Sequence, residues 1–248
     1  MIFNYDLRFG TFIRRPNRFI AHIDINGEEV ISHVPNTGRL RELLVPGASV
    51  MLSYHPSINR KTQYELRMVK KNNSWVSIDS QLPNALAKEA ITNDVIVELA
   101  GYSHIKREIA YQNSRFDLLL IKEDTISQNN SPCLETDKSE NNKSYCFVEV
   151  KGVTLERQGW TYFPDAPTKR GRKHIDELIH AANNGYRAVL LFIVQIEHAK
   201  GFSPNKITDP DFAASINEAK NAGVDLLAYR CSVTPYEAKV ISSIPVVL

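Results

Sequence analysis

The chain has 248 residues, of which 43% are hydrophobic, so it can bury one large core or two smaller ones. Its 30 Lys and Arg against 28 Asp and Glu give a formal net charge of +2, which is too small to mark a nucleic-acid-binding protein by itself. The basic excess is concentrated at the front, since residues 1–82 carry 11 basic and 7 acidic side chains.

The cysteines and the N-terminal residues bear on the compartment. Cys133, Cys146 and Cys231 are odd in number and lack the paired spacing of a zinc site or a disulfide framework. The first residues do not have the basic-then-apolar pattern of a signal peptide, and no apolar run approaches the ~18 residues of a transmembrane helix. We therefore expect reduced thiols in a cytoplasmic protein with no membrane partner.

The first third of the chain alternates between apolar and polar residues in short segments, with turn signals at Asn26-Gly27 and Pro46-Gly47. The segments that read as strands are Phe19–Ile25, Glu29–Ser32, Ser49–Ser53, Tyr64–Val69 and Trp75–Ile78. About five closely spaced strands predict an OB-like five-stranded β-barrel over residues 1–82.

The pattern changes to helical spacing near Pro83, and residues 83–248 predict an α/β domain with a mixed central sheet. The expected elements are a helix through Leu86 and Leu99, strands Ile105–Tyr111, Arg115–Lys122 and Ser144–Lys151, a helix Arg172–Asn184, a buried strand Ala188–Val194, a helix Asp209–Ala222 and a closing strand Asp225–Tyr229. Residues 123–143 are polar and nearly free of large apolar side chains, which predicts a hairpin insertion.

Glu149-Val150-Lys151 is the segment most suggestive of chemistry. On a strand, Glu149 and Lys151 point to the same face. If the neighbouring antiparallel strand brings Asp117 next to Glu149, a divalent cation would best relieve the repulsion between the two carboxylates. Mg²⁺ or Mn²⁺ would then polarise a phosphate while Lys151 supplies a fixed positive charge. The alternative is an ordinary surface ion pair on a half-exposed strand.

The order helix, strand, strand with Asp117, strand with Glu149 and Lys151, helix, strand resembles the PD-(D/E)xK nuclease superfamily. In that superfamily the first helix often supplies another carboxylate, and the resemblance places Glu89 in this catalytic role, with Glu98 as the competitor. Either residue could instead be a solvated charge on a helix face.

A more specific resemblance covers almost the whole chain. The matching blocks are Gly10-Thr11-Phe12-Ile13-Arg14-Arg15, Arg18-Phe19, His33-Val34-Pro35-Asn36-Thr37-Gly38, Leu82-Pro83-Asn84, Val148-Glu149-Val150-Lys151, Phe163-Pro164-Asp165-Ala166 and Arg170-Gly171-Arg172-Lys173-His174. These blocks resemble the signatures of the sugar fermentation stimulation protein family, in family order. The resemblance implies an OB-like N-terminal domain, a nuclease-like C-terminal domain, DNA binding and a link to sugar utilisation in bacteria. The chain departs from the family in two places: Val34 replaces the usual cysteine, and the hairpin between Asp117 and Glu149 is longer.

Three groups of residues are candidates for nucleic-acid binding. They are Arg14, Arg15 and Arg18 with interleaved aromatics; the turn residues His33, Asn36 and Thr37; and the cluster Lys169, Arg170, Arg172, Lys173 and His174. A helix N-terminus ordinarily attracts acidic side chains, so the last cluster predicts an anion such as phosphate nearby. The alternatives are a solvated arginine face with core aromatics, Phe19 among them, a purely structural turn, and local compensation of the cluster by Asp165 and other carboxylates.

The sequence thus predicts a DNA-binding protein without sequence preference, regulatory in sugar utilisation, with a nuclease-like metal site. A Mg²⁺-dependent nuclease is the alternative. A carbohydrate-binding protein is a weaker one, because the only tryptophans are Trp75 and Trp160.

Overall fold

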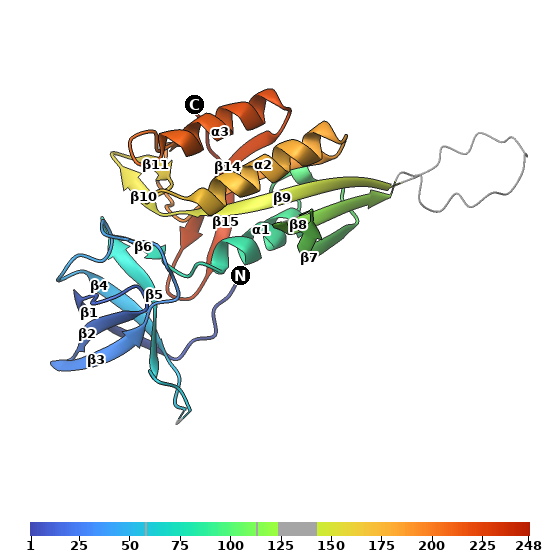
Figure 1. Cartoon of the computed structure of the whole chain (residues 1–248). Helices are drawn as coiled ribbons and strands as arrows, with labels where there is room; N and C mark the ends of the chain where they lie inside the picture. Colours follow the sequence, from blue (N-terminus) through green and yellow to red (C-terminus); the bar gives the residue numbers. More distant parts are fainter. Residues whose placement is uncertain (58, 113, 124–142) are drawn as a thin grey trace, which may run out of the picture.

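The computed structural model describes residues 1–57, 59–112, 114–123 and 143–248. It comprises an N-terminal barrel and a larger C-terminal α/β domain (Figure 1). The barrel strands are β1 (Leu7–Arg14), β2 (Ile20–Ile25), β3 (Glu28–His33), β4 (Ser49–Tyr54) and β5 (Tyr64–Lys71), with β6 (Ser74–Ser77) added beyond β5. A short parallel pairing of β3 with β5 closes the barrel.

The predicted five-stranded barrel is confirmed, but its strands differ from the expected set. The closed barrel uses β1, which the sequence pattern did not single out, and β6 is an extension rather than the fifth strand. In β1 only Phe12 is buried, so its apolar alternation is weak. A side chain at Gly10 would lie 2.5 Å from the carbonyl oxygen of Asp24, which shows how closely β2 approaches this strand.

The C-terminal domain is built on a mixed six-stranded sheet in the order β15-β14-β12-β9-β8-β7. The strands are β7 (His104–Tyr111), β8 (Ser114–Glu123), β9 (Lys143–Val153), β12 (Arg187–Val194), β14 (Asp225–Val233) and β15 (Ala238–Ser243). Strands β9, β12 and β14 are parallel to one another, and the other neighbours are antiparallel. The expectation that Asp225–Tyr229 closes the domain is wrong, because β14 continues to Val233 and the short strand β15 pairs outside it.

Helices cover both faces of this sheet (Figure 1). Helix α1 (Leu82–Thr92), followed by the 3-10 turn η1 (Val97–Leu99), packs Leu86 and Ile91 against one face. On the other face lie α2 (Lys169–Asn183) and α3 (Pro210–Asn221), with Ile175 and Phe212 in the core. Helix α2 begins three residues before the expected start because the Thr168 hydroxyl accepts the Gly171 amide proton as an N-cap.

A small second sheet lies at the end of the C-terminal domain nearest the barrel. It consists of β10 (Leu155–Arg157), β11 (Trp160–Phe163) and β13 (Gly201–Pro204). The sequence pattern did not predict these strands, since each has only three or four residues. They matter because β10 follows β9 after a single residue, so the chain passes from the central sheet directly into this small sheet.

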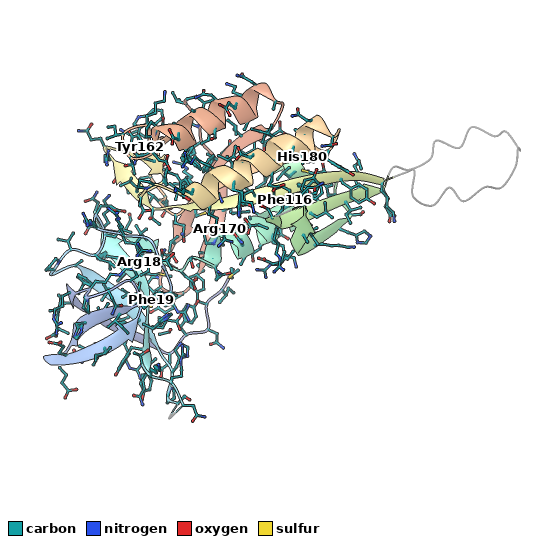
Figure 2. All side chains as sticks on the ribbon, in the orientation of Figure 1. Arg18, Phe19, Phe116, Tyr162, Arg170 and His180 are labelled. Carbon is teal, nitrogen blue, oxygen red and sulfur yellow. The ribbon has the colours of Figure 1, made fainter. Side chains whose placement is uncertain are left out.

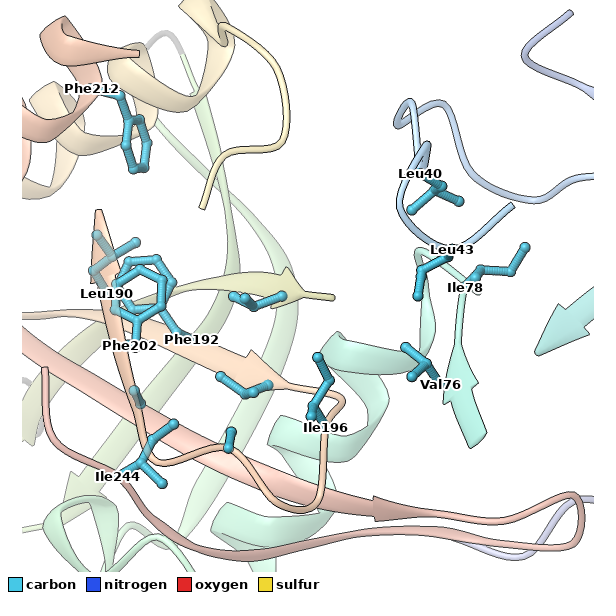
Figure 3. Close-up of a cluster of buried hydrophobic side chains, with 14 of the residues drawn as sticks. Leu40, Leu43, Val76, Ile78, Leu190, Phe192, Ile196, Phe202, Phe212 and Ile244 are labelled. Atoms are coloured by element: carbon cyan, nitrogen blue, oxygen red, sulfur yellow. The ribbon is translucent and has the colours of Figure 1, made fainter. Parts of the chain in front are cut away.

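The two domains share one contiguous cluster of buried apolar side chains. Figure 3 shows Leu40, Leu43, Val76 and Ile78 of the barrel side and Ile196, Phe192 and Phe202 of the C-terminal domain within this cluster. Polar links reinforce the contact. The Asp165 carboxylate accepts the amide protons of Arg39 at 3.0 Å and Leu40 at 3.4 Å, so the barrel is packed against the C-terminal domain.

The structure also bears on the cysteines and on the expected insertion. Cys146 and Cys231 are buried free thiols, and burial raises the pKa of each to about 12, which keeps them unreactive. Cys133 and residues 124–142 of the expected hairpin insertion lie outside the described residues. Among the residues that are described, no helix is long and apolar enough to cross a membrane.

Arg15 is a structural residue of the barrel, although the sequence suggested it for nucleic-acid binding. Its two terminal nitrogens donate to the backbone carbonyl oxygens of Gly38, Arg39, Arg18 and Asn36 at 2.6–3.0 Å. Its pKa is lowered, chiefly because burial disfavours the charged form. The guanidinium therefore ties β1 to the loop that follows β3.

We predict that Arg15→Lys destabilises the protein although it keeps the positive charge, because an ammonium cannot reach four carbonyl oxygens. The free energy of unfolding should fall by about 0.5–1.5 kcal/mol for each hydrogen bond lost, because the acceptors are only partly buried or exposed. Denaturant unfolding measures it, with Arg18→Lys as the matched control that should be neutral. Equal stability of both variants would contradict the structural role.

Candidate metal and nucleic-acid site

The candidate site lies where strands β8 and β9 separate. The two strands pair without interruption from Glu123 and Lys143 to Leu118 and Val148. The next residue of β8 is Asp117, and the next residue of β9 is Glu149. The predicted neighbourhood of these two carboxylates is therefore present, at the end of the ladder.

At the end of the ladder, the Asp117 carboxylate takes the place of a backbone carbonyl as the hydrogen-bond acceptor. One carboxylate oxygen accepts the Val150 amide proton at 2.8 Å, and the other accepts a proton from the Asn84 side-chain amide at 2.7 Å. Burial, together with the nearby charge of Glu149, raises the pKa of Asp117 to about 6. The carboxyl group is thus poised to exchange its proton for another positive charge near neutral pH.

Glu149 is only 2% exposed and yet is held as a carboxylate. Its Oε1 accepts a hydrogen bond from Lys151 Nζ at 2.5 Å and another from His174 Nδ1. Burial by itself raises the pKa of Glu149, but the bonds and charges of His174 and Lys151 outweigh it and lower that pKa below the usual range. The other oxygen, Oε2, is buried and has no hydrogen-bond partner among the described residues.

His174 is held between the carboxylate and a second cation. Its Nδ1 forms a hydrogen bond with Glu149 Oε1, and Arg170 Nε lies 3.4 Å from its Nε2. The sequence placed His174 among phosphate-binding residues. The structure places it in the carboxylate cluster, one turn inside α2, where it orients the buried acid.

The donor set fits a hard divalent cation. Glu149 Oε2 is an unsatisfied buried anionic oxygen, and such an atom calls for a cation or a donor. Within the described part of the chain, no group of three or more His, Cys, Asp or Glu residues is arranged around a common point. Two carboxylates suit Mg²⁺, which keeps several waters and commonly completes its shell with substrate phosphate oxygens.

Glu89 does not belong to this site, and its assignment as a catalytic residue is corrected. Its carboxylate forms an ion pair with the N-terminal ammonium of Met1 at 2.8 Å, and its side chain is 41% exposed. Asn84 is the residue of α1 that reaches Asp117. Five residues separate the two, so at 3.6 residues per turn they lie on different faces of the helix. Glu98, the competitor, binds the Tyr229 hydroxyl instead.

Asn84 was not selected from the sequence, although it stands in the block Leu82-Pro83-Asn84. A usable signal was its place in the first turn of a helix with Pro83 at the start, where a short amide side chain can reach past the helix end. Which strand Asn84 contacts depends on how α1 crosses the sheet. That crossing is set by tertiary packing, so the local sequence does not reveal it.

The barrel arginines differ in their availability. Arg14 pairs with Glu29 at 2.9 Å while remaining 56% exposed, and Arg18 is exposed at the surface. Phe19, which the alternation assigned to the core, is 55% exposed, so that expectation is wrong. The reason is local: the Asn17 side chain accepts the amide protons of Phe19 and Ile20 and turns the chain before β2 begins. Figure 2 shows Arg18 and Phe19 on the barrel below Arg170.

The turn after β3 is held from within the protein. The Asn36 amide donates to the Ile78 carbonyl at 2.8 Å and its oxygen accepts the Gly38 amide proton at 2.7 Å. Asn36 is therefore used in shaping the loop rather than for an external contact. His33 is half-buried and Thr37 is exposed, and their assignment to nucleic acid stays a prediction.

The basic start of α2 is compensated in part, but not by Asp165. Arg172 pairs with Asp211 of α3, and the Asp209 carboxylate accepts the Thr168 amide proton at 2.8 Å. Asp165 instead binds backbone amides of the barrel. Lys169, Arg170 and Lys173 are exposed, and the first turn of α2 contains no acidic residue. Figure 2 shows Arg170 at the end of α2 nearest the barrel.

Comparison with known proteins gives consistent matches along the chain. Residues 81–237 match the family model described as the sugar fermentation stimulation protein RE domain, and residues 13–78 match the SfsA N-terminal OB domain. A sugar fermentation stimulation protein homolog of Clostridium perfringens (strain 13 / Type A) is 43% identical over 248 residues, covering the whole of both chains. A homolog of Clostridium botulinum (strain Alaska E43 / Type E3) is 45% identical over 234 residues, or 94% of each chain.

A solved structure is similar over the same length. It is described as the structure of Pyrococcus furiosus SfsA in complex with Ca²⁺, has a TM-score of 0.83 and 28% identity, and is matched over 100% of this chain and 98% of its own. The fold and both domain models agree with the relatives found by sequence. The chain belongs to the sugar fermentation stimulation protein family.

Proposed function

We propose that this protein binds DNA through its phosphates, without sequence preference, and holds a divalent metal ion at Asp117 and Glu149. The observation that carries the proposal is the buried, unpaired Oε2 of Glu149 beside a second carboxylate. The related Pyrococcus furiosus protein was solved with Ca²⁺, which supports a divalent ion here. Mg²⁺ or Mn²⁺ is our assignment, because a two-carboxylate set leaves room for water and phosphate oxygens.

The basic groups near the carboxylates support phosphate as the anion. Lys169 and Arg170 stand in the first turn of α2, where the helix dipole adds positive potential. His174, four residues along the same helix, reaches Glu149 itself. A phosphate bound at this helix end would thus lie within the reach of the proposed metal site. A role in regulating sugar utilisation is consistent with the family name and is part of the proposal.

Phosphodiester hydrolysis is the second candidate, favoured by the position of Lys151. Its ammonium lies 2.5 Å from Glu149 Oε1 and its side chain is 13% exposed, so it supplies a fixed charge beside the place of the metal. When bound, the metal would polarise a phosphate oxygen and acidify water. Lys151 would stabilise charge that develops on the phosphate, and His174 keeps Glu149 oriented.

We predict that binding of a divalent metal depends on Asp117. Calorimetric titration with Mn²⁺ should show binding to the wild type and to Lys151→Ala, and none to Asp117→Asn, which is nearly isosteric but cannot offer a charged oxygen pair. Glu89→Gln is the matched control and should bind as the wild type does. Equal Mn²⁺ affinity of the wild type and Asp117→Asn would contradict the metal site and leave the cluster as an ordinary ion pair.

The pH dependence of this titration has a definite sign. The folded-state pKa of Asp117 is raised to about 6, so the protonated acid favours folding, and this contribution is lost as pH rises through about 6. Metal must displace that proton below about pH 6. The Mn²⁺ affinity, and the rise in Tm on adding Mn²⁺, should therefore increase from below to above about pH 6. A pH-independent affinity would contradict Asp117 as the ligand that loses a proton.

A second prediction concerns the phosphate contacts. Affinity for duplex DNA should fall with salt, by a log–log slope of about 0.9 for each phosphate neutralised. Replacing Lys169 or Arg18 with Ala should reduce that slope, whereas Lys239→Ala, at the opposite sheet edge in β15, should leave it unchanged. Fluorescence anisotropy over a salt series measures it. Affinity insensitive to salt would refute phosphate-driven binding.

Cleavage separates the two candidates. If the protein is a nuclease, incubation with linear DNA and Mg²⁺ or Mn²⁺ should give products, and Lys151→Ala should abolish them while it keeps the metal. If it only holds DNA, no product forms in the wild type although both ligands bind. Gel analysis of both proteins, each checked by calorimetry, distinguishes these outcomes.

A further inference from the structure

A pocket is lined by residues of both domains, among them Gly152, three residues beyond Glu149 on β9. Its volume is about 210 Å³. Asn36 and Leu40 line it from the barrel, Asp79 and Ser80 from the connecting segment, and Tyr162 and Gln195 from the C-terminal domain. Gly152 and Thr154 also line it, so β9 runs from Glu149 and Lys151 straight into the pocket wall, a span of roughly 10 Å.

Gln195 lines this pocket and also carries an unsatisfied polar group. It is 2% exposed, and its side-chain oxygen is buried without a hydrogen-bond partner within the described ranges. Its backbone amide donates to the Val153 carbonyl at 2.9 Å, which fixes the residue at the end of β12. A buried amide oxygen left unpaired costs about 1–3 kcal/mol, so this position is suited to an incoming donor.

The charges of the pocket exclude phosphate as its occupant. Asp79 and Asp165 both line it, and each already accepts bonds from the protein: Asp79 from Arg67 at 2.8 Å, and Asp165 from two barrel amides. Carboxylates repel a phosphate but accept hydrogen bonds from N–H groups. The occupant should therefore be neutral and carry donors.

The volume and the lining residues indicate a small occupant with apolar or aromatic surface. Leu40, Leu155 and Pro83 give the pocket apolar surface, and Tyr162 and Phe163 give it aromatic rings. Its volume is below the roughly 300–1,000 Å³ of pockets for larger ligands. Figure 2 places Tyr162 on the small sheet at the barrel end of the C-terminal domain.

We propose that this inter-domain pocket receives one unstacked nucleobase of bound DNA, and that Gln195 selects a base with an exocyclic amino group, adenine first. A glutamine amide offers an acceptor and a donor side by side, the pair that matches adenine. Aromatic walls accept the face of an extruded base. The inference rests on the proposed function, since it names the part of the DNA that enters beside the metal site.

The test uses single-stranded thymidine oligonucleotides of about 12 nucleotides, either uniform, with one central adenine, or with one central abasic position. Fluorescence anisotropy with the full-length protein should give about tenfold tighter binding of the adenine oligonucleotide than of the other two. Gln195→Leu should remove this preference and keep the affinity for the uniform strand. Lys239→Ala, in β15, should keep the preference.

Equal affinity of the wild type for all three oligonucleotides would overturn the pocket assignment, while a salt-dependent affinity for all of them would leave the proposed DNA binding intact. Absence of binding to any oligonucleotide would overturn both. If Gln195→Leu fails to fold, judged from its Tm, Tyr162→Leu on the half-buried ring takes its place, and an unchanged adenine preference in that variant would count against the pocket.

Discussion

The structure depends on keeping one buried glutamate ionised. Glu149 is 2% exposed on a central strand of the C-terminal six-stranded sheet, where an unpaired carboxylate would cost several kcal/mol. Lys151 from the same strand and His174 from α2 both bond to its Oε1. The basic start of α2, which runs against the helix dipole, is thus explained in part by a buried anion that belongs to the protein, and Arg170 supports it through His174.

The second carboxylate is held by different means, and this difference gives the pair its chemistry. Asp117 has no cation bonded to it among the described residues; a backbone amide and the Asn84 side chain hold it, and its pKa rises to about 6. One acid is therefore kept charged and the other is close to its titration point near neutral pH. Two carboxylates with separated pKa values, one of them with an orphan oxygen, are the basis of the metal site that we propose.

The sequence predicted those features that depend on short-range periodicity. Alternation placed Glu149 and Lys151 on one strand face, and the turn chemistry located the loop around Asn36. The sequence could not show what Asn84 and Gln195 contact, because their neighbours come from strands far away in the chain. It misplaced Glu89, whose partner is the Met1 ammonium 88 residues away, and Phe19, which the Asn17 turn carries out of the barrel. Arg15 was misjudged for the same reason: three of its four carbonyl acceptors come from the distant loop after β3 and meet it only in the folded barrel.

The barrel also supplies part of the wall of the inter-domain pocket. The loop that Arg15 and Asn36 hold together contributes Asn36, Gly38 and Leu40 to the inter-domain pocket, and Asp165 of the C-terminal domain binds the same loop from the other side. The apolar cluster in Figure 3 contains side chains from both domains. Since large apolar interfaces restrict relative domain motion, the pocket and the carboxylate pair are held at a constant separation. A ligand that occupies both sites must therefore span the fixed distance between them. A polymer with one reactive linkage beside each base can do so, whereas a free anion cannot.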